Sequence, residues 1–310
     1  MSSDVHVFGP VPSRRLGLSL GVSPIPEKTC NYSCTYCQLG RTTHMRNKRE
    51  LFYPVEEIAN EVRDALNNNS AIDVVSIVGE GEPTLYAGLG ELIDTIKTFT
   101  DKPVALITNG ALFYDEQVRA ESAKSDIVLP SLDGYDEASW KTIDRPYGRL
   151  NYEAVIDGLV KFGQEYSGQH WIEIMLVKGS NDSDEALTAF SKILSKIKHD
   201  RLFVNTPVRP PAESFVQPTD HETVAKFAKK LNGTAIDALV STGFSSDISD
   251  NYEAIHSIIL RHPMNNFEIN NFLTTRKSSE TEIAFVFAKL QANSCITSIE
   301  YKGFVTYRAN

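Results

Sequence analysis

Short apolar runs alternate with amphipathic stretches along the first two thirds of the chain. The runs are rich in valine, isoleucine and leucine, a composition typical of strands that are buried on both faces of a parallel sheet. Six strands are predicted, at residues 18–22, 72–78, 104–107, 126–129, 171–177 and 201–204. 

Amphipathic helices separate these strands. Several of the helical stretches open with an Asp, Ser or Thr that can cap a helix. The predicted helices cover residues 55–66, 89–99, 115–123, 152–166, 184–197 and 221–231. The fold class is therefore α/β: six βα units form a parallel sheet with helices outside, which can curl into a partial (β/α)6 barrel. We expect the chemistry at the C-terminal ends of the strands.

A different pattern begins at about residue 232. Three short helices are predicted at residues 252–260, 265–273 and 279–290, followed by a hairpin at 295–299 and 304–307. This order is typical of a winged helix-turn-helix. The sequence thus predicts two domains, a barrel at residues 1–240 and a small winged-helix-like C-terminal module at 250–310.

The last predicted helix is a poor surface for phosphates. It begins Ser279-Glu-Thr-Glu282 and is otherwise apolar with a single Lys289. Reading of duplex DNA is therefore disfavoured, and a docking or substrate-presenting role is favoured for the module.

Composition narrows the class of protein further. The 310 residues are 41% hydrophobic, enough for a large core, and no run of 18 apolar residues occurs. The N-terminus lacks the layout of a secretory signal, so we expect a cytoplasmic protein without membrane contact. The net charge of −9 provides no footprint for non-specific nucleic-acid binding. For the basic stretch 41–49, a solvated loop is favoured over a contact site.

Three of the four cysteines lie within eight residues, at Cys30, Cys34 and Cys37. Three thiolates can hold three corners of a [4Fe–4S] cluster and leave the fourth iron open to another ligand, which indicates a reactive centre. Zinc, with His44 as fourth ligand, is the disfavoured alternative. Cys295 is interpreted as a small core hydrophobe.

The cysteine spacing and the motifs at the strand ends resemble the radical S-adenosylmethionine (SAM) superfamily over residues 8 to 210. The resemblance implies that Tyr36 lies against the adenine, and that Gly81 and Glu82 of Gly79-Glu-Gly-Glu-Pro83 contact the amino group of SAM. Glu80 is an extra carboxylate in this motif. The positions implied for the ribose and methionine portions are Thr108, Asn109, Ser131 and Asp133.

This resemblance also implies the chemistry. SAM would chelate the open iron, and one electron passed from the reduced cluster into the sulfonium would break a carbon–sulfur bond and leave a 5′-deoxyadenosyl radical. A reductase or a flavodoxin-like protein would supply the electron. The protein's part is placement, through a carboxylate that holds the ammonium group and glycines that let the backbone approach.

Several of these residues have structural alternatives. Glu80 and Glu82 can cap the helix that follows, because carboxylates favour helix N-termini. Arg14 and Arg15 can anchor the N-terminal segment by salt bridges, or they can contact an anionic substrate or the SAM carboxylate, which would make Arg14 a catalytic residue. Arg209, between prolines at a strand end, is predicted to face the barrel mouth as a catalytic or substrate-contacting residue.

A narrower resemblance points to compact wybutosine-synthesis-like iron–sulfur oxidoreductases. It rests on Phe8-Gly-Pro-Val-Pro-Ser-Arg-Arg-Leu-Gly17, Asp144-Arg-Pro146 and Asn205-Thr-Pro-Val-Arg-Pro-Pro211. The chain lacks the additional N-terminal cysteines that hold a second cluster in the wybutosine enzyme. The preferred hypothesis is a radical SAM enzyme acting on a peptide, a protein or a small anionic metabolite. The alternatives are tRNA base modification and a cluster-bearing DNA-binding redox regulator.

Overall fold

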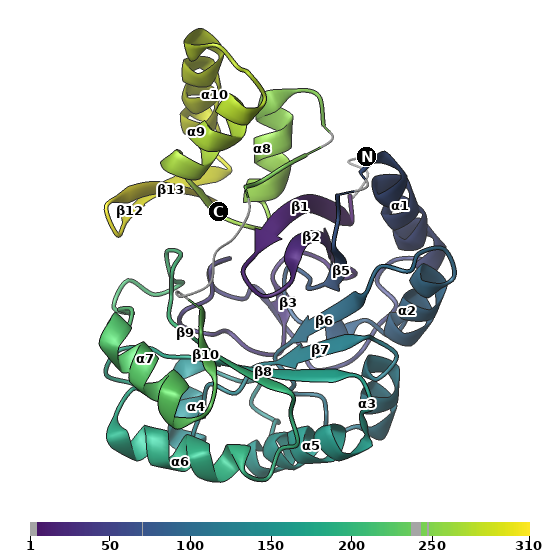
Figure 1. Cartoon of the computed structure of the whole chain (residues 1–310), viewed down its shortest axis with the longest axis vertical. Helices are drawn as coiled ribbons and strands as arrows, with labels where there is room; N and C mark the ends of the chain where they lie inside the picture. The colour runs from purple at the N-terminus through teal and green to yellow at the C-terminus, as the bar shows by residue number, and fades with distance from the viewer. Residues whose placement is uncertain (1–4, 70, 237–242, 247) are drawn as a thin grey trace.

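The computed structural model describes residues 5–69, 71–236, 243–246 and 248–310. A curved eight-stranded sheet runs through the larger part of the molecule, with helices along its outer side (Figure 1). In spatial order the strands are β1 (Val7–Ser13), β2 (Gly17–Val22), β5 (Val74–Ile77), β6 (Val104–Thr108), β7 (Ile127–Pro130), β8 (Gln169–Met175), β9 (Arg201–Asn205) and β10 (Thr234–Ala235). All neighbours are parallel except β1 and β2. The six predicted strands and the α/β class are confirmed.

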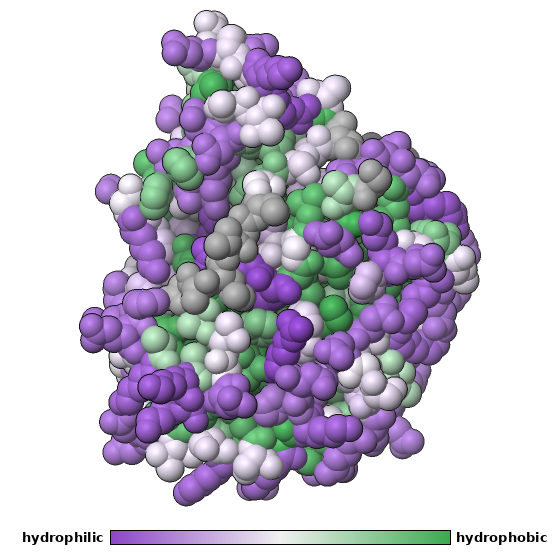
Figure 2. All heavy atoms as spheres, in the orientation of Figure 1, coloured by the Kyte–Doolittle hydropathy of each residue, from purple (hydrophilic) through white to green (hydrophobic). Residues whose placement is uncertain are grey.

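The helices cover the outer face because each has one apolar side. They are α1 (Val55–Asn68), α2 (Leu89–Lys97), α3 (Glu116–Ser122), α4 (Glu137–Ile143), α5 (Tyr152–Glu165), α6 (Asp184–Leu194) and α7 (His221–Lys230). Asp115, Asn151, Ser183 and Asp220 accept the first free backbone N–H groups, as the capping pattern predicts. The sequence reading missed the short α4. The rim formed by α1, α2 and α3 is mostly hydrophilic in Figure 2.

The two edge strands were not predicted, for different reasons. β1 contains Pro10 and Pro12, which remove backbone donors and hide a strand signal. An edge strand tolerates them, because one of its sides has no neighbour to receive the missing hydrogen bonds. β10 has two residues, too few to show a period.

The C-terminal module has its own core and packs against β1. It contains α8 (Asn251–Ile259), β11 (Met264–Asn265), α9 (Asn266–Thr275), α10 (Glu280–Ala292), β12 (Ile296–Tyr301) and β13 (Phe304–Ala309). Phe8 and Val11 of β1 belong to the same apolar cluster as Ile255 and Leu273 of the module. The three helices and the hairpin lie where they were predicted, and the assignment to the winged-helix class stays a prediction.

Three further points concern the sequence expectations. The predicted domain boundary at residue 240 lies outside the described residues. Cys295 is exposed, so its interpretation as a core residue is wrong, because it lies just before β12 and not within the hairpin core. Within the described ranges, every helix is too short or too polar to cross a membrane.

Candidate active site

A cavity of about 470 Å³ lies inside the curved sheet and brings together most of the predicted site residues. Its walls include the turn between β1 and β2, the cysteine segment, several C-terminal strand ends and part of the C-terminal module. The predicted residues on these walls are Arg14, Cys30, Cys34, Tyr36, Cys37, Gly81, Glu82, Thr108, Asn109, Ser131 and Arg209. Asp133 does not line this cavity.

The cysteine segment forms a loop that is closed at its base. β3 (Thr29–Cys30) pairs with β4 (His44–Met45), and the Arg46 N–H donates to the carbonyl oxygen of Cys30 at 3.0 Å. Within the loop, the Cys37 N–H donates to the carbonyl oxygen of Cys34 at 3.1 Å. Backbone pairing therefore holds the cysteines on one side of the cavity.

Glu213 ties this loop to two other segments, a role that the sequence reading missed. Its carboxylate accepts hydrogen bonds from Nε and Nη2 of Arg41, both at 2.8 Å, and pairs with Arg145 at 2.5 Å. The hydrogen bonds from Arg41 lower the pKa of Glu213 to about 2. Because Arg41 and Arg145 lie far from Glu213 in the sequence, no local motif predicts these contacts.

Burial raises the pKa of all three clustered thiols, and the negative charge of Glu82 raises that of Cys30 further. Thiolates at these positions therefore need a positive partner. Iron would supply it, since metal binding displaces thiol protons. Cys30 Sγ also accepts hydrogen bonds from the Tyr32 N–H at 3.4 Å and from Asn109 Nδ2 at 3.8 Å. The three cysteines thus fit the ligand set of a [4Fe–4S] cluster with one open iron.

Glu82 is a buried carboxylate, 1% exposed, with one oxygen saturated and the other partly free. Oε1 accepts from the N–H and hydroxyl of Thr84 at 2.9 and 2.6 Å and from the Thr108 hydroxyl at 2.5 Å. Oε2 accepts from the Asn109 N–H at 2.7 Å. Glu82 therefore caps the short helix η1 (Pro83–Leu85), which was its structural alternative, and also lines the cavity. Burial raises the pKa of Glu82, opposed by these hydrogen bonds, so a cationic group would favour the carboxylate form.

Gly81 has a steric reason to be glycine. A Cβ atom there would lie 1.8 Å from the carbonyl oxygen of Thr29. The same carbonyl accepts a hydrogen bond from the Glu82 N–H at 3.0 Å. The glycine thus allows the loop that carries Glu82 to lie directly against the strand that carries Cys30.

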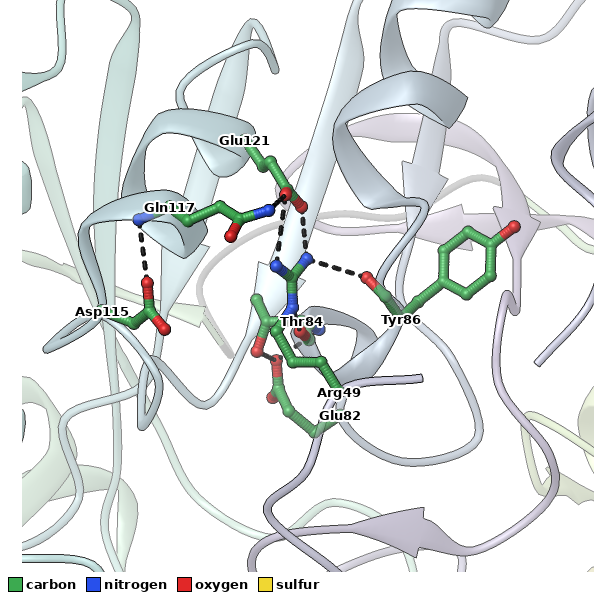
Figure 3. Close-up of polar contacts among 7 residues, drawn as sticks. All are labelled: Arg49, Glu82, Thr84, Tyr86, Asp115, Gln117 and Glu121. Carbon is green, nitrogen blue, oxygen red and sulfur yellow. Dashed lines mark hydrogen bonds and ion pairs between the residues drawn. The ribbon is translucent and has the colours of Figure 1, made fainter. Parts of the chain in front are cut away.

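Arg49 braces the segment after Glu82 (Figure 3). Its guanidinium donates to the carbonyl oxygens of Thr84 and Tyr86 at 2.9 and 3.0 Å, and it forms an ion pair with Glu121. The Arg49 side chain is 16% exposed. The expectation of a solvated basic loop is therefore wrong for Arg49, because its partners lie on η1 and α3.

Tyr36 and Asp133 meet behind the cavity wall. The Tyr36 hydroxyl donates to Asp133 Oδ2, and Asp133 Oδ1 accepts from the Met175 N–H at 2.7 Å. Asp133, 4% exposed, thus holds Tyr36 and β8, and its contact with SAM stays a prediction. The Ser131 hydroxyl lines the cavity without a hydrogen-bond partner in the part of the chain that the structure describes.

Most arginines on the cavity wall are paired. Arg15 forms an ion pair with Glu173 of β8, and Arg209 forms a bidentate pair with Glu268 of α9 at 2.5 and 2.6 Å. Arg209 therefore lines the cavity with its charge already engaged, and its catalytic or substrate-contacting role stays a prediction. Arg14 is exposed and has no ion-pair partner among the described residues.

Fold and site together define an α/β barrel-like protein with an iron–sulfur ligand set at its strand ends. Residues 25–190 match the model of the Radical SAM superfamily, and the chain belongs to this family. Its members are enzymes whose cofactors are a [4Fe–4S] cluster and SAM.

The relatives include proteins of similar length and one much longer protein. UPF0026 protein MJ1312 of Methanocaldococcus jannaschii is 33% identical over 315 residues, which cover 98% of this chain and 95% of the relative. A protein called GTPase Obg in Brachyspira hyodysenteriae is 34% identical over 310 residues, and this chain spans only 45% of its length.

Solved structures share the fold at low identity. A structure of TYW1 with a lysine-pyruvate adduct bound has a TM-score of 0.54 and 19% identity, covering 69% of this chain and 72% of that one. A structure of anSMEcpe with bound AdoMet has a TM-score of 0.51 and 19% identity, covering 69% and 59%. These neighbours confirm the barrel part of the predicted fold.

Proposed function

We propose that this radical SAM enzyme abstracts a hydrogen atom from an anionic substrate, a small metabolite or a peptide segment, in the cavity inside the sheet. When bound and reduced by an external reductase or flavodoxin-like donor, the cluster would supply the one electron whose transfer to SAM yields methionine and a 5′-deoxyadenosyl radical. The observation that carries the proposal is the convergence of the three cysteines and Glu82 on one cavity, with Asn109 hydrogen-bonded to both Cys30 and Glu82.

The SAM contacts follow from which polar groups are still available. Glu82 Oε2 would accept a hydrogen bond from the SAM amino group, because Oε1 already has three donors. Ser131 would offer its hydroxyl to the ribose or the methionine carboxylate. Tyr36, held from behind by Asp133, would place its ring against the adenine. Thr108 and Asn109 would position Glu82 and Cys30 and would not bind SAM through their engaged groups.

The charge of the cavity favours an anionic substrate. Arg15 and Arg209 neutralise Glu173 and Glu268, whereas Arg14 keeps an available positive charge beside the cavity. A carboxylate or phosphate could pair with this guanidinium. Arg209 would act indirectly, by holding Glu268 and with it the wall formed by the C-terminal module.

Anaerobic reconstitution tests the proposed chemistry. The protein should take up iron and show a broad absorption at about 400 nm. After reduction, it should convert SAM into 5′-deoxyadenosine and methionine. A folded preparation with three free thiols that takes up no iron, or a reduced cluster that leaves SAM intact, would contradict it.

Binding of bulk tRNA tests the substrate class. The net charge of −9 and the apolar last helix favour a non-nucleic-acid substrate, so no binding is expected at about 50 mM salt. Tight binding with a steep salt dependence would transfer the proposal to tRNA modification. If the protein bound DNA specifically and SAM did not change the spectrum of its cluster, a redox regulator would be supported instead.

A further inference from the structure

Glu80, the extra carboxylate of the Gly-Glu-Gly-Glu-Pro motif, points to the C-terminal module. Glu80 Oε2 lies 3.3 Å from Nε of Arg261, and both side chains are 11% exposed. Arg261 follows α8 by two residues, and Glu80 precedes Glu82 by two residues. The ion pair therefore joins the loop that carries Glu82 to the module that forms part of the cavity wall.

The backbone around Glu80 is tied to the strand that carries Cys30. The Lys28 N–H donates to the carbonyl oxygen of Glu80 at 2.8 Å, and the Glu82 N–H donates to that of Thr29 at 3.0 Å. On its other side, the Glu80 N–H donates to the Ser23 hydroxyl at 3.1 Å. With Gly81 pressed against Thr29, a shift of Glu80 would be passed on to Glu82.

Arg261 is held by the docked state of the module. Its guanidinium lies over the ring of Phe8, 5.5 Å from the centroid, and Nη2 donates to the carbonyl oxygen of Val5. Its own N–H donates to the carbonyl oxygen of Ile258 at 3.0 Å. Arg261 can therefore reach Glu80 only while the module packs on β1.

The loop has a physical reason to follow this pair. Burial raises the pKa of Glu80, and the nearby Arg261 charge opposes that rise. Without Arg261, a buried carboxylate would be left uncompensated, which favours movement of the loop toward water. Such movement would displace Glu82 from Thr108 and Asn109.

We propose that Glu80 is a positioning residue for SAM, whose pair with Arg261 couples docking of the C-terminal module to the geometry of Glu82. The coupling rests on the proposed contact between Glu82 and the SAM amino group. By thermodynamic reciprocity, SAM binding then stabilises the docked module to the same extent as docking strengthens SAM binding.

The test measures SAM affinity of the full-length, anaerobically reconstituted protein by equilibrium dialysis. Glu80→Gln and Arg261→Gln should each raise the dissociation constant for SAM about ten-fold. The dissociation constant of the double variant should not exceed the larger of the two single-variant values. Glu253→Gln removes an exposed carboxylate of α8 whose partner, Lys289, lies within the module, so its dissociation constant should stay within about two-fold of the wild-type value. Hydrogen exchange adds a readout of docking: SAM should slow exchange in α8 of the wild type but not of Glu80→Gln.

The outcomes separate this inference from the proposed function. If the wild type does not bind SAM, both fail. If the wild type binds SAM and the Glu80 and Arg261 variants bind equally well, or if their effects add, the coupling is refuted. An equal loss in Glu253→Gln would also refute it, because any loss of charge in the module would then explain the effect. If Glu80→Gln does not fold, Arg261→Gln tests the pair from the module side.

Discussion

The two halves of the cavity are built in different ways. The cofactor half, Cys30, Cys34, Cys37, Glu82 and Asn109, comes from strand ends and a loop that hydrogen-bond to one another. The half that we propose for the substrate contains Arg14 and the pairs Arg15–Glu173 and Arg209–Glu268, which join segments distant in sequence. Backbone hydrogen bonds thus hold much of the cofactor half, whereas the proposed substrate half depends mainly on how the module and the sheet edges meet.

Loss of a cluster ligand should have the largest effect. Cys34→Ser should abolish reductive SAM cleavage, a loss of at least about 10³-fold, because a cluster needs all three thiolates. Iron content and 5′-deoxyadenosine formation measure it. Cys295→Ser is the matched control, since Cys295 is exposed in the module, and it should keep its iron. Equal losses in both variants would contradict the assignment of Cys34 as a cluster ligand.

Neutralising Glu82 should weaken SAM binding without unloading iron. Glu82→Gln removes the charge that faces the SAM ammonium, and a charge-assisted hydrogen bond is worth about 1.5–3 kcal/mol, or roughly 10- to 100-fold in affinity. Equilibrium dialysis of the reconstituted protein measures this. Glu137→Gln, in an exposed pair with Lys141, should bind SAM like the wild type. Unchanged affinity in Glu82→Gln would leave Glu82 as a helix cap only.

Replacing Arg49 should lower the stability of the fold. Arg49→Gln leaves Glu121 without its guanidinium partner and frees two carbonyl oxygens, so the free energy of unfolding should fall by about 2 kcal/mol. Urea denaturation measures the change. Lys141→Gln, on an exposed pair, should stay within about 0.5 kcal/mol. Matching values for the two variants would mean that Arg49 does not brace the loop.

Glu213 should produce the smallest effect, a contribution to stability that is present near neutral pH and lost in acid. Its folded pKa of about 2 lies below the ordinary value of 4.5, so its pairing stabilises the fold above about pH 4.5 and is lost as pH falls toward 2. Because Arg41 is 70% exposed, solvent screening reduces this to about 1 kcal/mol. Stability of the wild type should fall more steeply between pH 5 and 3 than that of Glu213→Gln. Parallel curves would show that Glu213 is not a net stabilising contact.

The same contrast explains what could be predicted from the sequence. The six buried strands and their capped helices follow from periodicity, and the cysteine spacing and strand-end motifs indicate the cofactor half. Glu213, Glu268 and Arg261 carry no local pattern, because each matters only through a partner on another element. For the same reason, Arg209 was predicted at the mouth but its pairing was not. The family resemblance implied that Asp133 contacts SAM, but it gave no sign that the Asp133 carboxylate also binds the Tyr36 hydroxyl.

A crystal structure of the reconstituted protein with SAM tests the central claim most directly. We expect the SAM amino nitrogen within hydrogen-bonding distance of Glu82 Oε2, with Oε1 still bound to Thr84 and Thr108. An amino group bound elsewhere, with Glu82 in contact only with protein donors, would contradict the account.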